Sequence, residues 1–463
     1  MSLQAIILAA GRGTRMKSDL PKVLQPICGR PMIAYAFDIA ASCGAKQPIV
    51  VLGKDAEDVK AYLPKDARVV VQEKPLGTGD AVLAAKKLIS QSGDVLILYA
   101  DTPLVRRATV QRLVETHRKT NATVTLLTAH LADPAGYGRV VRDPTGIVTG
   151  IVEEVEANAA EKAIREINVG PLTAKVVPLF EALANVSPSK SGKEWYLTEA
   201  IHILSKRDGT KFSAARVEKA QEALGVNSKI DLAKATSIIR QRILESHMAN
   251  GVTVVDPQAT YIDHGVTIGA DTVVHPGSVI ESGVTIGRHC SIGPYAHLRE
   301  GVEVGDESKI GNFAELVRAK VGAKVRMGHF SYIGDATVAD NVNIGAGTIT
   351  ANYDGRQKHA TVIGKNAFIG SDTVLVAPVS VGEGAVTGAG SVVTRGNNVP
   401  AGKTALGVPA RVLDGTARVP EPEARPVNGN GGHTKAPRAA APARAAKRAP
   451  AKKAKPVSRS RRR

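Results

Sequence analysis

The chain has 463 residues, of which 43% are hydrophobic, and its formal net charge is +18. This length is too great for one hydrophobic core and predicts two or three domains. No apolar run is long enough to span a bilayer, and no secretion signal is visible, so we expect a cytoplasmic protein. Three widely spaced cysteines, Cys28, Cys43 and Cys290, argue against a disulfide framework and against a cysteine-rich zinc site.

The first element is an apolar run at residues 4–8, which predicts a buried parallel strand, followed by a glycine-containing loop. Gly11 and Gly13 let backbone amides approach an anion closely. Positive charge is brought to the same place by Arg12, Arg15 and Lys22. The spacing matches neither a Walker loop nor a Rossmann fingerprint. A turn that needs glycine only for its geometry is the alternative, but the flanking basic residues favour a nucleotide-binding loop.

Strand-like runs then alternate with amphipathic, helix-like stretches. The strand-like runs are 4–8, 48–52, 69–72, 95–100 and 123–129, and the helical patterns include 31–43 and 79–89. This alternation predicts a mostly parallel α/β sheet with a ligand crevice at the carboxyl ends of its strands. Gln72 ends one strand before a flexible turn at 76–79, which is suited to reading a base edge. Asp101 follows another strand, where its carboxylate either holds a magnesium ion that bridges phosphates or simply caps the next element.

Residues 228–248 predict one long amphipathic helix that connects two domains, with Leu232, Ala235, Ile239 and Ile243 on its apolar face. Beyond it, residues 262–315 divide without a gap into nine hexads that open with an aliphatic residue or an equivalent, and the pattern resumes from Val321 to Val381. A six-residue period predicts a parallel β-helix. We expect a single break in this period, at the polar loop 351–359, and insertions of this kind commonly form binding sites.

His329 lies among the hexads and is a candidate general base, since an imidazole accepts a proton near neutral pH. A structural histidine that is hydrogen-bonded between coils is the alternative, and a lone histidine does not decide between them.

The basic charge is concentrated at the end of the chain. From Thr416 onward there are fourteen Lys or Arg and two acidic residues, so this tail carries +12 of the net +18. Residues 420–463 are rich in Ala, Pro, Lys and Arg without any aromatic residue, which predicts disorder. The tail is either an arm that binds polyanions, such as nucleic acid or an anionic membrane face, or a solubilising extension.

Together these motifs resemble the family of bifunctional N-acetylglucosamine-1-phosphate uridyltransferase/glucosamine-1-phosphate acetyltransferases. The resemblance runs in one order from about Leu3 to about Pro409. It rests on the segments 8–15, 21–24, 137–139, 150–153, 167–168, 225–227, 328–329, 332–335, 341–349 and 351–355. It implies a Rossmann-like nucleotidyltransferase domain at 1–227, a linker helix at 228–250, a left-handed parallel β-helix of hexapeptide repeats at 251–414 and a disordered basic tail at 415–463.

The resemblance also implies the reactions and the residues that perform them. The product would be UDP-N-acetylglucosamine, a precursor of peptidoglycan and other envelope glycans. UTP and the sugar phosphate would be bound by Leu8, Ala9, Ala10, Gly11, Lys22, Gln72, Gly77, Thr78, Gly138, Glu153, Asn168, Thr198 and Asn227. Mg²⁺ would be bound by Asp101 and Asn227, and in-line attack on UTP would be assisted by the charges of Arg15 and Lys22.

In the second half, the resemblance makes His329 the base that activates the sugar amine. Glucosamine-1-phosphate would be positioned by Arg299, Tyr332, Asn343, Asn352, Tyr353 and Lys358. Acetyl-CoA would be contacted by Ala346, Ser371 and Ala389. Family members are trimers through the β-helix, which implies the same assembly here.

Two positions depart from the family pattern. Val317 stands where a lysine is usual, and the next residue, Arg318, should point to the opposite side of an extended coil. Gly407 stands where an arginine often faces coenzyme A. Replacing Val317 with Lys should therefore lower the KM for glucosamine-1-phosphate. Two rival functions remain at this stage: a monofunctional uridyltransferase with a β-helix that serves only as a scaffold, and a nucleic-acid- or envelope-binding protein that acts through its tail.

Overall fold

The computed structural model describes residues 3–11, 13–54, 56–188 and 194–416. The basic tail after residue 416 and the loop residue Arg12 lie outside the described residues, so both hypotheses about the tail stay predictions. Within the described ranges, none of the helices combines the length and the apolar character that are needed to cross a bilayer.

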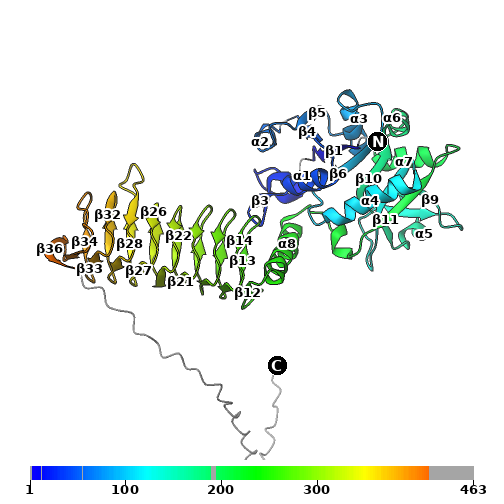
Figure 1. The fold of residues 1–463 in the computed structure, drawn as a ribbon. Helices are drawn as coiled ribbons and strands as arrows, with labels where there is room; N and C mark the ends of the chain where they lie inside the picture. The colour runs from blue at the N-terminus through cyan, green and yellow to red at the C-terminus, as the bar shows by residue number, and fades with distance from the viewer. Residues whose placement is uncertain (1–2, 12, 55, 189–193, 417–463) are drawn as a thin grey trace, which may run out of the picture. The chain divides into compact units, whose positions relative to one another are not determined.

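The N-terminal part is built on a sheet with the strand order β11-β7-β10-β6-β1-β4-β5 (Figure 1). Its strands are β1 (Leu3–Ala9), β4 (Ile49–Gly53), β5 (Arg68–Gln72), β6 (Asp94–Tyr99), β7 (Val124–His130), β10 (Glu166–Lys175) and β11 (Phe212–Arg216). β1 pairs in parallel with both β4 and β6, as the buried runs predict, whereas β10 is antiparallel to β6 and β7. β8 (Arg139–Arg142) and β9 (Val148–Val152) form an antiparallel hairpin that pairs with β10. The predicted sheet is thus mostly, but not wholly, parallel.

The helices of this domain follow the strands. They are α1 (Ile33–Ser42), α2 (Glu57–Ala61), α3 (Thr78–Ala84), α4 (Arg107–Thr120), α5 (Ala159–Lys162), α6 (Val176–Leu183) and α7 (Leu197–Ser205). Alternate residues of the central strands enter two different cores: Ile7 packs with α1 and α4, while Ile6 packs with α3, α6 and α7. Because both faces of the sheet are covered, ligands can reach it only at strand ends and their loops.

The predicted linker helix is α8 (Lys229–Ala249). It begins at a capping box, in which the Ser228 hydroxyl accepts a bond from the Asp231 backbone N–H and the Asp231 carboxylate accepts one from Ser228 N–H. Ala235 and Ile239 are buried as predicted, and Leu244 is also fully buried because it belongs to the core of the β-helix that follows.

After α8 the chain winds as a β-helix with three parallel sheets, whose coils are visible in Figure 1. Sheet I contains β12 (Thr253–Val254), β15 (Val273–Val274), β18 (Ser291–Ile292), β21 (Lys309–Asn312), β24 (Arg326–His329), β27 (Asn343–Ile344), β30 (Phe368–Ile369), β33 (Val386–Thr387) and β35 (Lys403–Leu406), with β36 (Arg411–Thr416) antiparallel at its end. Sheet II contains β13 (Tyr261–Ile262), β16 (Val279–Ile280), β19 (His297–Leu298), β22 (Glu315–Val317), β25 (Tyr332–Gly334), β28 (Ile349–Ala351), β31 (Val374–Val376) and β34 (Val392–Val393). Sheet III contains β14 (Thr267–Ile268), β17 (Thr285–Ile286), β20 (Glu303–Val304), β23 (Lys320–Val321), β26 (Ala336–Val338), β29 (Thr361–Ile363) and β32 (Val379–Val381). The aliphatic residue of each hexad enters one continuous core, as the six-residue period predicts.

The expectation of a single break in the period is wrong. Leu298 pairs with Leu316, 18 residues on, but Leu316 pairs with Ile333, only 17 residues on. One residue is missing from the corner between β22 and β23, where Arg318 adopts a left-handed backbone with φ +48°. A tight left-handed corner replaces the longer turn, so the aliphatic residues stay in register and the core is uninterrupted.

Candidate functional sites

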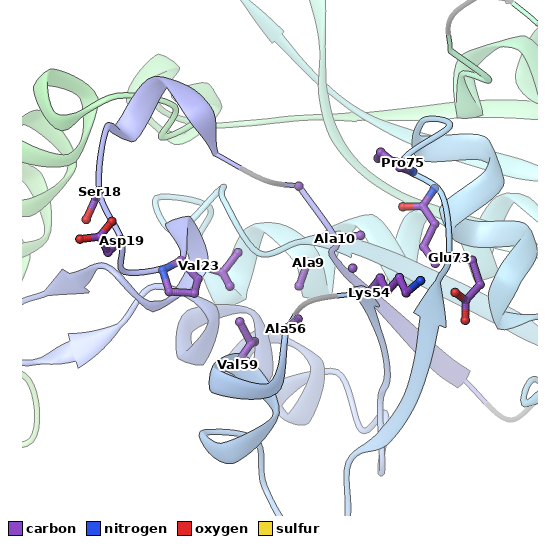
Figure 2. A pocket seen from close by; sticks show the side chains of 14 residues that line it. Ala9, Ala10, Ser18, Asp19, Val23, Lys54, Ala56, Val59, Glu73 and Pro75 are labelled. Atoms are coloured by element: carbon purple, nitrogen blue, oxygen red, sulfur yellow. The ribbon is translucent and has the colours of Figure 1, made fainter.

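A cavity of about 260 Å³ lies where the predicted glycine-containing loop leaves β1. Ala9, Ala10, Gly11 and Gln72 line it, which brings together four of the residues predicted to hold UTP. In Figure 2, Lys54 and Glu73 lie on one side of Ala9 and Ala10, and Ser18 and Asp19 lie on the other. Lys54 and Glu73 were not predicted. They follow the ends of β4 and β5, and this position after a parallel strand was the signal that could have found them.

The turn that carries Gly77 and Thr78 is fixed by the chain just before α7. Trp195 N–H donates to Leu76 O at 2.6 Å, and Leu197 N–H donates to the Thr78 hydroxyl at 3.0 Å. Gly77 has φ +119°, and a Cβ there would lie 2.5 Å from Trp195 O, so no other residue fits. Gln72 Nε2 donates to Gly77 O at 3.0 Å. These contacts join the predicted base-reading turn to the helix that carries Thr198.

Lys22 joins residues that are distant in the sequence. Its ammonium donates to Asp101 Oδ2 at 2.5 Å and to Asn227 Oδ1 at 3.3 Å, and its side chain is only 9% exposed. Lys22 is held there because Gly13 packs against it: a Cβ on Gly13 would lie 2.5 Å from Lys22 Cβ. Arg15, in the short 3-10 turn η1 (Thr14–Met16), is exposed.

The contacts of Lys22 also indicate whether a metal ion could bind between Asp101 and Asn227. One cation, the ammonium, already lies within reach of both the Asp101 carboxylate and the Asn227 amide oxygen, so these two oxygens converge on one cation position. Among the described residues, no three His, Cys, Asp or Glu side chains gather as metal ligands. Two oxygen ligands from the protein suit Mg²⁺, which usually takes one or two carboxylates and completes its shell with phosphate and water.

A third group of predicted residues surrounds Glu153. The Thr198 hydroxyl donates to Glu153 Oε1 at 2.9 Å, and Asn168 N–H donates to Gly138 O at 2.9 Å. A Cβ on Gly138 would lie 3.3 Å from Glu153 Oε2, so this glycine leaves the carboxylate room. Burial raises the pKa of Glu153, against the opposing effect of the Thr198 hydrogen bond.

The loop at Gly138 is held by an ion pair that sequence reasoning missed. Arg139 is 2% exposed and its Nη2 lies 2.6 Å from Glu154 Oε2, while its Nη1 donates to Tyr137 O. An arginine this well buried needs a partner, and the acidic pair of Glu153 and Glu154 at the end of the motif 150–153 was the available signal.

In the β-helix, His329 ends β24 and is exposed. Its Nδ1 lies 3.0 Å from Asn312 Oδ1, on the preceding coil of sheet I. Because an amide oxygen only accepts hydrogen bonds, this contact places the proton on Nδ1 and leaves Nε2 able to accept one. The structure is therefore compatible with both hypotheses for His329. One ring nitrogen is hydrogen-bonded between coils, and the other is able to act as a base. Asn312 was not predicted as a site residue.

Tyr332 and Asn352, both predicted to bind the sugar phosphate, lie together. Asn352 Nδ2 donates to the Tyr332 hydroxyl at 3.5 Å and also to Asp335 Oδ2. Asp335 is paired with Arg318, at 2.5 Å from Nε to Oδ1 and 2.7 Å from Nη2 to Oδ2. The expectation that Arg318 points away from this region is wrong, because residue 318 lies in a left-handed corner and not in an extended strand. Val317 is 8% exposed and contributes no charge.

The other predicted sugar-phosphate residues lie around the same coils. Tyr353 and Lys358 form a β-bridge that closes the polar loop after β28. Arg299 Nε donates to Glu315 Oε1 at 2.7 Å. Asn343 is placed on β27, next to β24 of His329. Among the described residues, neither Arg299 nor Asn343 forms a hydrogen bond or an ion pair with His329, so their roles stay predictions.

The three residues predicted to contact acetyl-CoA occupy equivalent positions on consecutive coils. Each follows a glycine at the end of a sheet I strand: Ala346 after Gly345, Ser371 after Gly370 and Ala389 after Gly388. Backbone bonds join these corners, with Asp372 N–H donating to Ala346 O at 2.7 Å and Gly390 N–H to Ser371 O at 2.8 Å. Gly407 has φ +94°, a conformation that explains glycine at this position.

Comparisons with known proteins agree with both halves. A MobA-like NTP transferase domain model matches residues 5–170, and a bacterial transferase hexapeptide (six repeats) model matches residues 283–318 and 360–395. "Bifunctional protein GlmU" of Thermoanaerobacter pseudethanolicus is 42% identical over 87% of this chain and 95% of its own. The protein of the same name from Geobacillus sp. is 44% identical over 84% of this chain and 92% of its own. That from Listeria monocytogenes serovar 1/2a is 41% identical over 87% and 95%.

A solved UDP-glucose pyrophosphorylase complexed with UDP-glucose aligns with 52% of this chain and all of its own, with 19% identity and a TM-score of 0.44. The predicted order of a nucleotidyltransferase domain and a hexapeptide β-helix is confirmed by the two domain models and by the sheets of the structure. Since these three relatives are 41–44% identical and are covered over 92–95% of their own length, the chain belongs to the family of bifunctional GlmU proteins.

Proposed function

We propose that this protein makes UDP-N-acetylglucosamine by two successive reactions. The β-helix site transfers the acetyl group of acetyl-CoA to glucosamine-1-phosphate, and the N-terminal site then transfers UMP from UTP to the product and releases pyrophosphate. The observation that carries the proposal is the convergence of the Asp101 carboxylate and the Asn227 amide oxygen on one cation position, which the Lys22 ammonium reaches; the sequence neighbours of Lys22, Pro21 and Val23, line the cavity at the predicted nucleotide loop. Such a site neutralises phosphate charge, which is the main requirement of nucleotidyl transfer.

In the uridylyl transfer, a phosphate oxygen of the sugar phosphate attacks the α-phosphorus of UTP, and the bond from that phosphorus to the bridging oxygen of pyrophosphate breaks. The attacking oxygen is already anionic, so no general base is needed. Lys22 and Arg15 offset the charge of the triphosphate, while Glu153 and Thr198 orient the sugar. Asp101 and Asn227 would hold Mg²⁺, which when bound adds positive charge beside the phosphates.

In the acetyl transfer, the amine of the sugar attacks the thioester carbonyl, and the bond to sulfur breaks. His329 Nε2 takes the proton that the amine loses, and the departing thiolate of coenzyme A gains a proton. Asn312 keeps the imidazole in the required tautomer through its 3.0 Å contact with Nδ1. Tyr332, Asn352 and Lys358 would orient the sugar phosphate.

We further propose that the β-helix assembles as a homotrimer. Tyr295, Phe313 and Phe330 occupy consecutive coils and are 57%, 60% and 57% exposed, with Tyr295 and Phe313 stacked at 5.3 Å between ring centroids. Phe330 is the neighbour of His329 in the sequence, so association through this aromatic ladder would enclose the base. A cytoplasmic location is proposed with it, since UTP and acetyl-CoA are metabolites of that compartment.

The proposal is tested by measuring two products in parallel on the purified full-length protein. Thiol release from acetyl-CoA with glucosamine-1-phosphate should fall by at least about a hundredfold in His329→Ala, the usual contribution of a general base. Pyrophosphate release from UTP and N-acetylglucosamine-1-phosphate should be unchanged in that variant and should stop when EDTA removes the metal.

Pyrophosphate release without any thiol release would contradict the acetyl transfer and support the monofunctional rival. Equal loss of both activities in His329→Ala would instead indicate a damaged fold. A third experiment truncates the chain before Thr416 and measures binding to nucleic acid and to anionic vesicles. Loss of this binding with unchanged turnover would support the hypothesis that the tail is a polyanion-binding arm.

A further inference from the structure

The shortened corner at residues 317–319 recurs on the next coil, because Val338 follows Ile333 by five positions just as Val321 follows Leu316. Val317 is the last residue of β22 and is buried, while Arg318 follows in a left-handed conformation and its side chain is 45% exposed. Asp335 occupies the equivalent left-handed corner one coil later, with φ +48°, and its N–H donates to Val317 O at 2.9 Å. The two corners are therefore stacked, and the Arg318 side chain leaves the coil directly over the Asp335 carboxylate.

Arg318 and Asp335 form a two-pronged pair, with distances of 2.5 and 2.7 Å, in which both carboxylate oxygens are engaged. A bidentate pair of this kind is stronger than a single contact between flexible side chains, and it fixes the orientation of both side chains more narrowly. The Arg318 hydrogen bonds keep the pKa of Asp335 below its ordinary value. Asp335 is thus a fixed negative charge that this arginine balances.

The Asp335 carboxylate lies among the residues predicted to hold the sugar phosphate. It accepts a hydrogen bond from Asn352, and Asn352 in turn contacts the Tyr332 hydroxyl. Lys358 is close enough to contribute to the lowered pKa of Asp335. Gly334 allows this arrangement, because a Cβ there would lie 2.6 Å from the Tyr332 hydroxyl and 2.7 Å from Asn352 Nδ2.

The charges of Arg318, Asp335 and Lys358 determine whether this region attracts or repels the phosphate of the sugar. Without Arg318, the Asp335 carboxylate would face an anionic sugar phosphate, and Lys358 alone would offset it. Val317 cannot supply the missing positive charge. An arginine paired through both oxygens cancels the carboxylate and at the same time fixes the acceptor that orients Asn352.

We propose that Arg318 is a positioning residue for glucosamine-1-phosphate: through Asp335 it orients Asn352, and it balances the Asp335 carboxylate that would otherwise repel the phosphate. This inference rests on the acetyl transfer proposed above. Arg318 acts through Asp335 and Asn352, so its effect belongs to the sugar phosphate and not to acetyl-CoA.

The test measures thiol release by the full-length protein at varied concentrations of each substrate. Arg318→Gln should raise the KM for glucosamine-1-phosphate by about tenfold, the usual effect of losing a charge-assisted hydrogen bond. The KM for acetyl-CoA and pyrophosphate release by the other site should not change. Arg318→Lys should recover part of the loss, and adding Val317→Lys to Arg318→Gln should restore the KM to within about threefold of the wild type.

Lys320→Gln is the control, because Lys320 also forms an ion pair between consecutive coils, with Glu303 at 2.9 Å on sheet III, although both side chains of this pair are more exposed than those of Arg318 and Asp335. An unchanged KM for glucosamine-1-phosphate in Arg318→Gln would overturn the inference. So would a lowered melting temperature accompanied by equal losses for both substrates, since that pattern belongs to a structural residue.

Calorimetric titration of the same variants with glucosamine-1-phosphate separates this inference from the proposed function. Binding that weakens about tenfold in Arg318→Gln supports the positioning role even if the wild type releases no thiol, a result that would contradict only the acetyl transfer. Equal binding by the wild type and Arg318→Gln would overturn the positioning role even if acetyl transfer occurs.

Discussion

Glu153 shows how burial of a single residue changes the chemistry of a site. Its pKa is raised because burial disfavours the charged form, and the neighbouring acidic residues add to the effect. A carboxyl whose folded pKa lies above its unfolded value, about 4.3, weakens the folded state when it ionises. The free energy of unfolding should therefore fall as the pH rises from the ordinary to the raised pKa.

Glu153→Gln should remove this pH dependence and keep the acceptor for the Thr198 hydroxyl. We expect a melting temperature at pH 7 that equals or exceeds that of the wild type, and a smaller change on acidification to about pH 4. The KM for N-acetylglucosamine-1-phosphate should rise several-fold. Thermal denaturation across this pH range checks the first expectation, and a wild type and variant with parallel pH profiles would contradict it.

The polar loop between β28 and β29 is an element held mainly by one carboxylate. Asp354 accepts bonds from His359 Nε2 at 2.7 Å, from Arg395 Nη2 at 3.0 Å and from two backbone N–H groups of its own loop. These bonds hold the pKa of Asp354 well below its usual range, so it stays ionised and the loop stays closed at neutral pH. Arg395 also donates to Ala377 O at 3.2 Å, which ties the loop to the next coil.

Arg395→Gln should loosen this loop, since it removes a cationic partner of Asp354. Hydrogen exchange of residues 352–359 should become faster, and the KM for glucosamine-1-phosphate should rise about three- to tenfold, because the loop carries Asn352 and Lys358. Arg411→Gln, a change of an exposed arginine on β36, provides the control. Unchanged exchange in the loop would show that Arg395 does not hold it.

At the scale of the whole molecule, the proposed trimer depends on the aromatic ladder, which consists of the exposed side chains of Tyr295, Phe313 and Phe330. Three large exposed aromatic side chains on adjacent coils are costly to leave in water, and burying each is worth roughly 1.5–3 kcal/mol. The double change Tyr295→Ser and Phe313→Ser should therefore convert a trimer to monomers, as measured by sedimentation velocity. It should lower acetyl transfer more than uridylyl transfer.

Tyr62→Ser is the matched control for this experiment. Tyr62 is 65% exposed but follows α2 of the N-terminal domain, so its change should leave the assembly intact. A double variant that sediments as the wild type does would assign the aromatic ladder another role.

The sequence by itself determined the fold classes, because the patterns that reveal them are local, and its resemblance to a known family supplied most of the candidate residues. The hexad period, the alternation of strands and helices and the loop with Gly11 and Gly13 each depend on residues a few positions apart. The position of Asp101 after a buried strand was enough to place it at the crevice.

Only the tertiary structure decided which of these residues meet. Lys22 lies 79 residues from Asp101 and 205 from Asn227, and no local pattern joins them. The position of Arg318 depended on the coil above it, since Asp335 and the shortened register decide that residue 318 turns a left-handed corner. Strand alternation gave the wrong side for Arg318 because alternation holds within an extended strand and ends where the backbone turns.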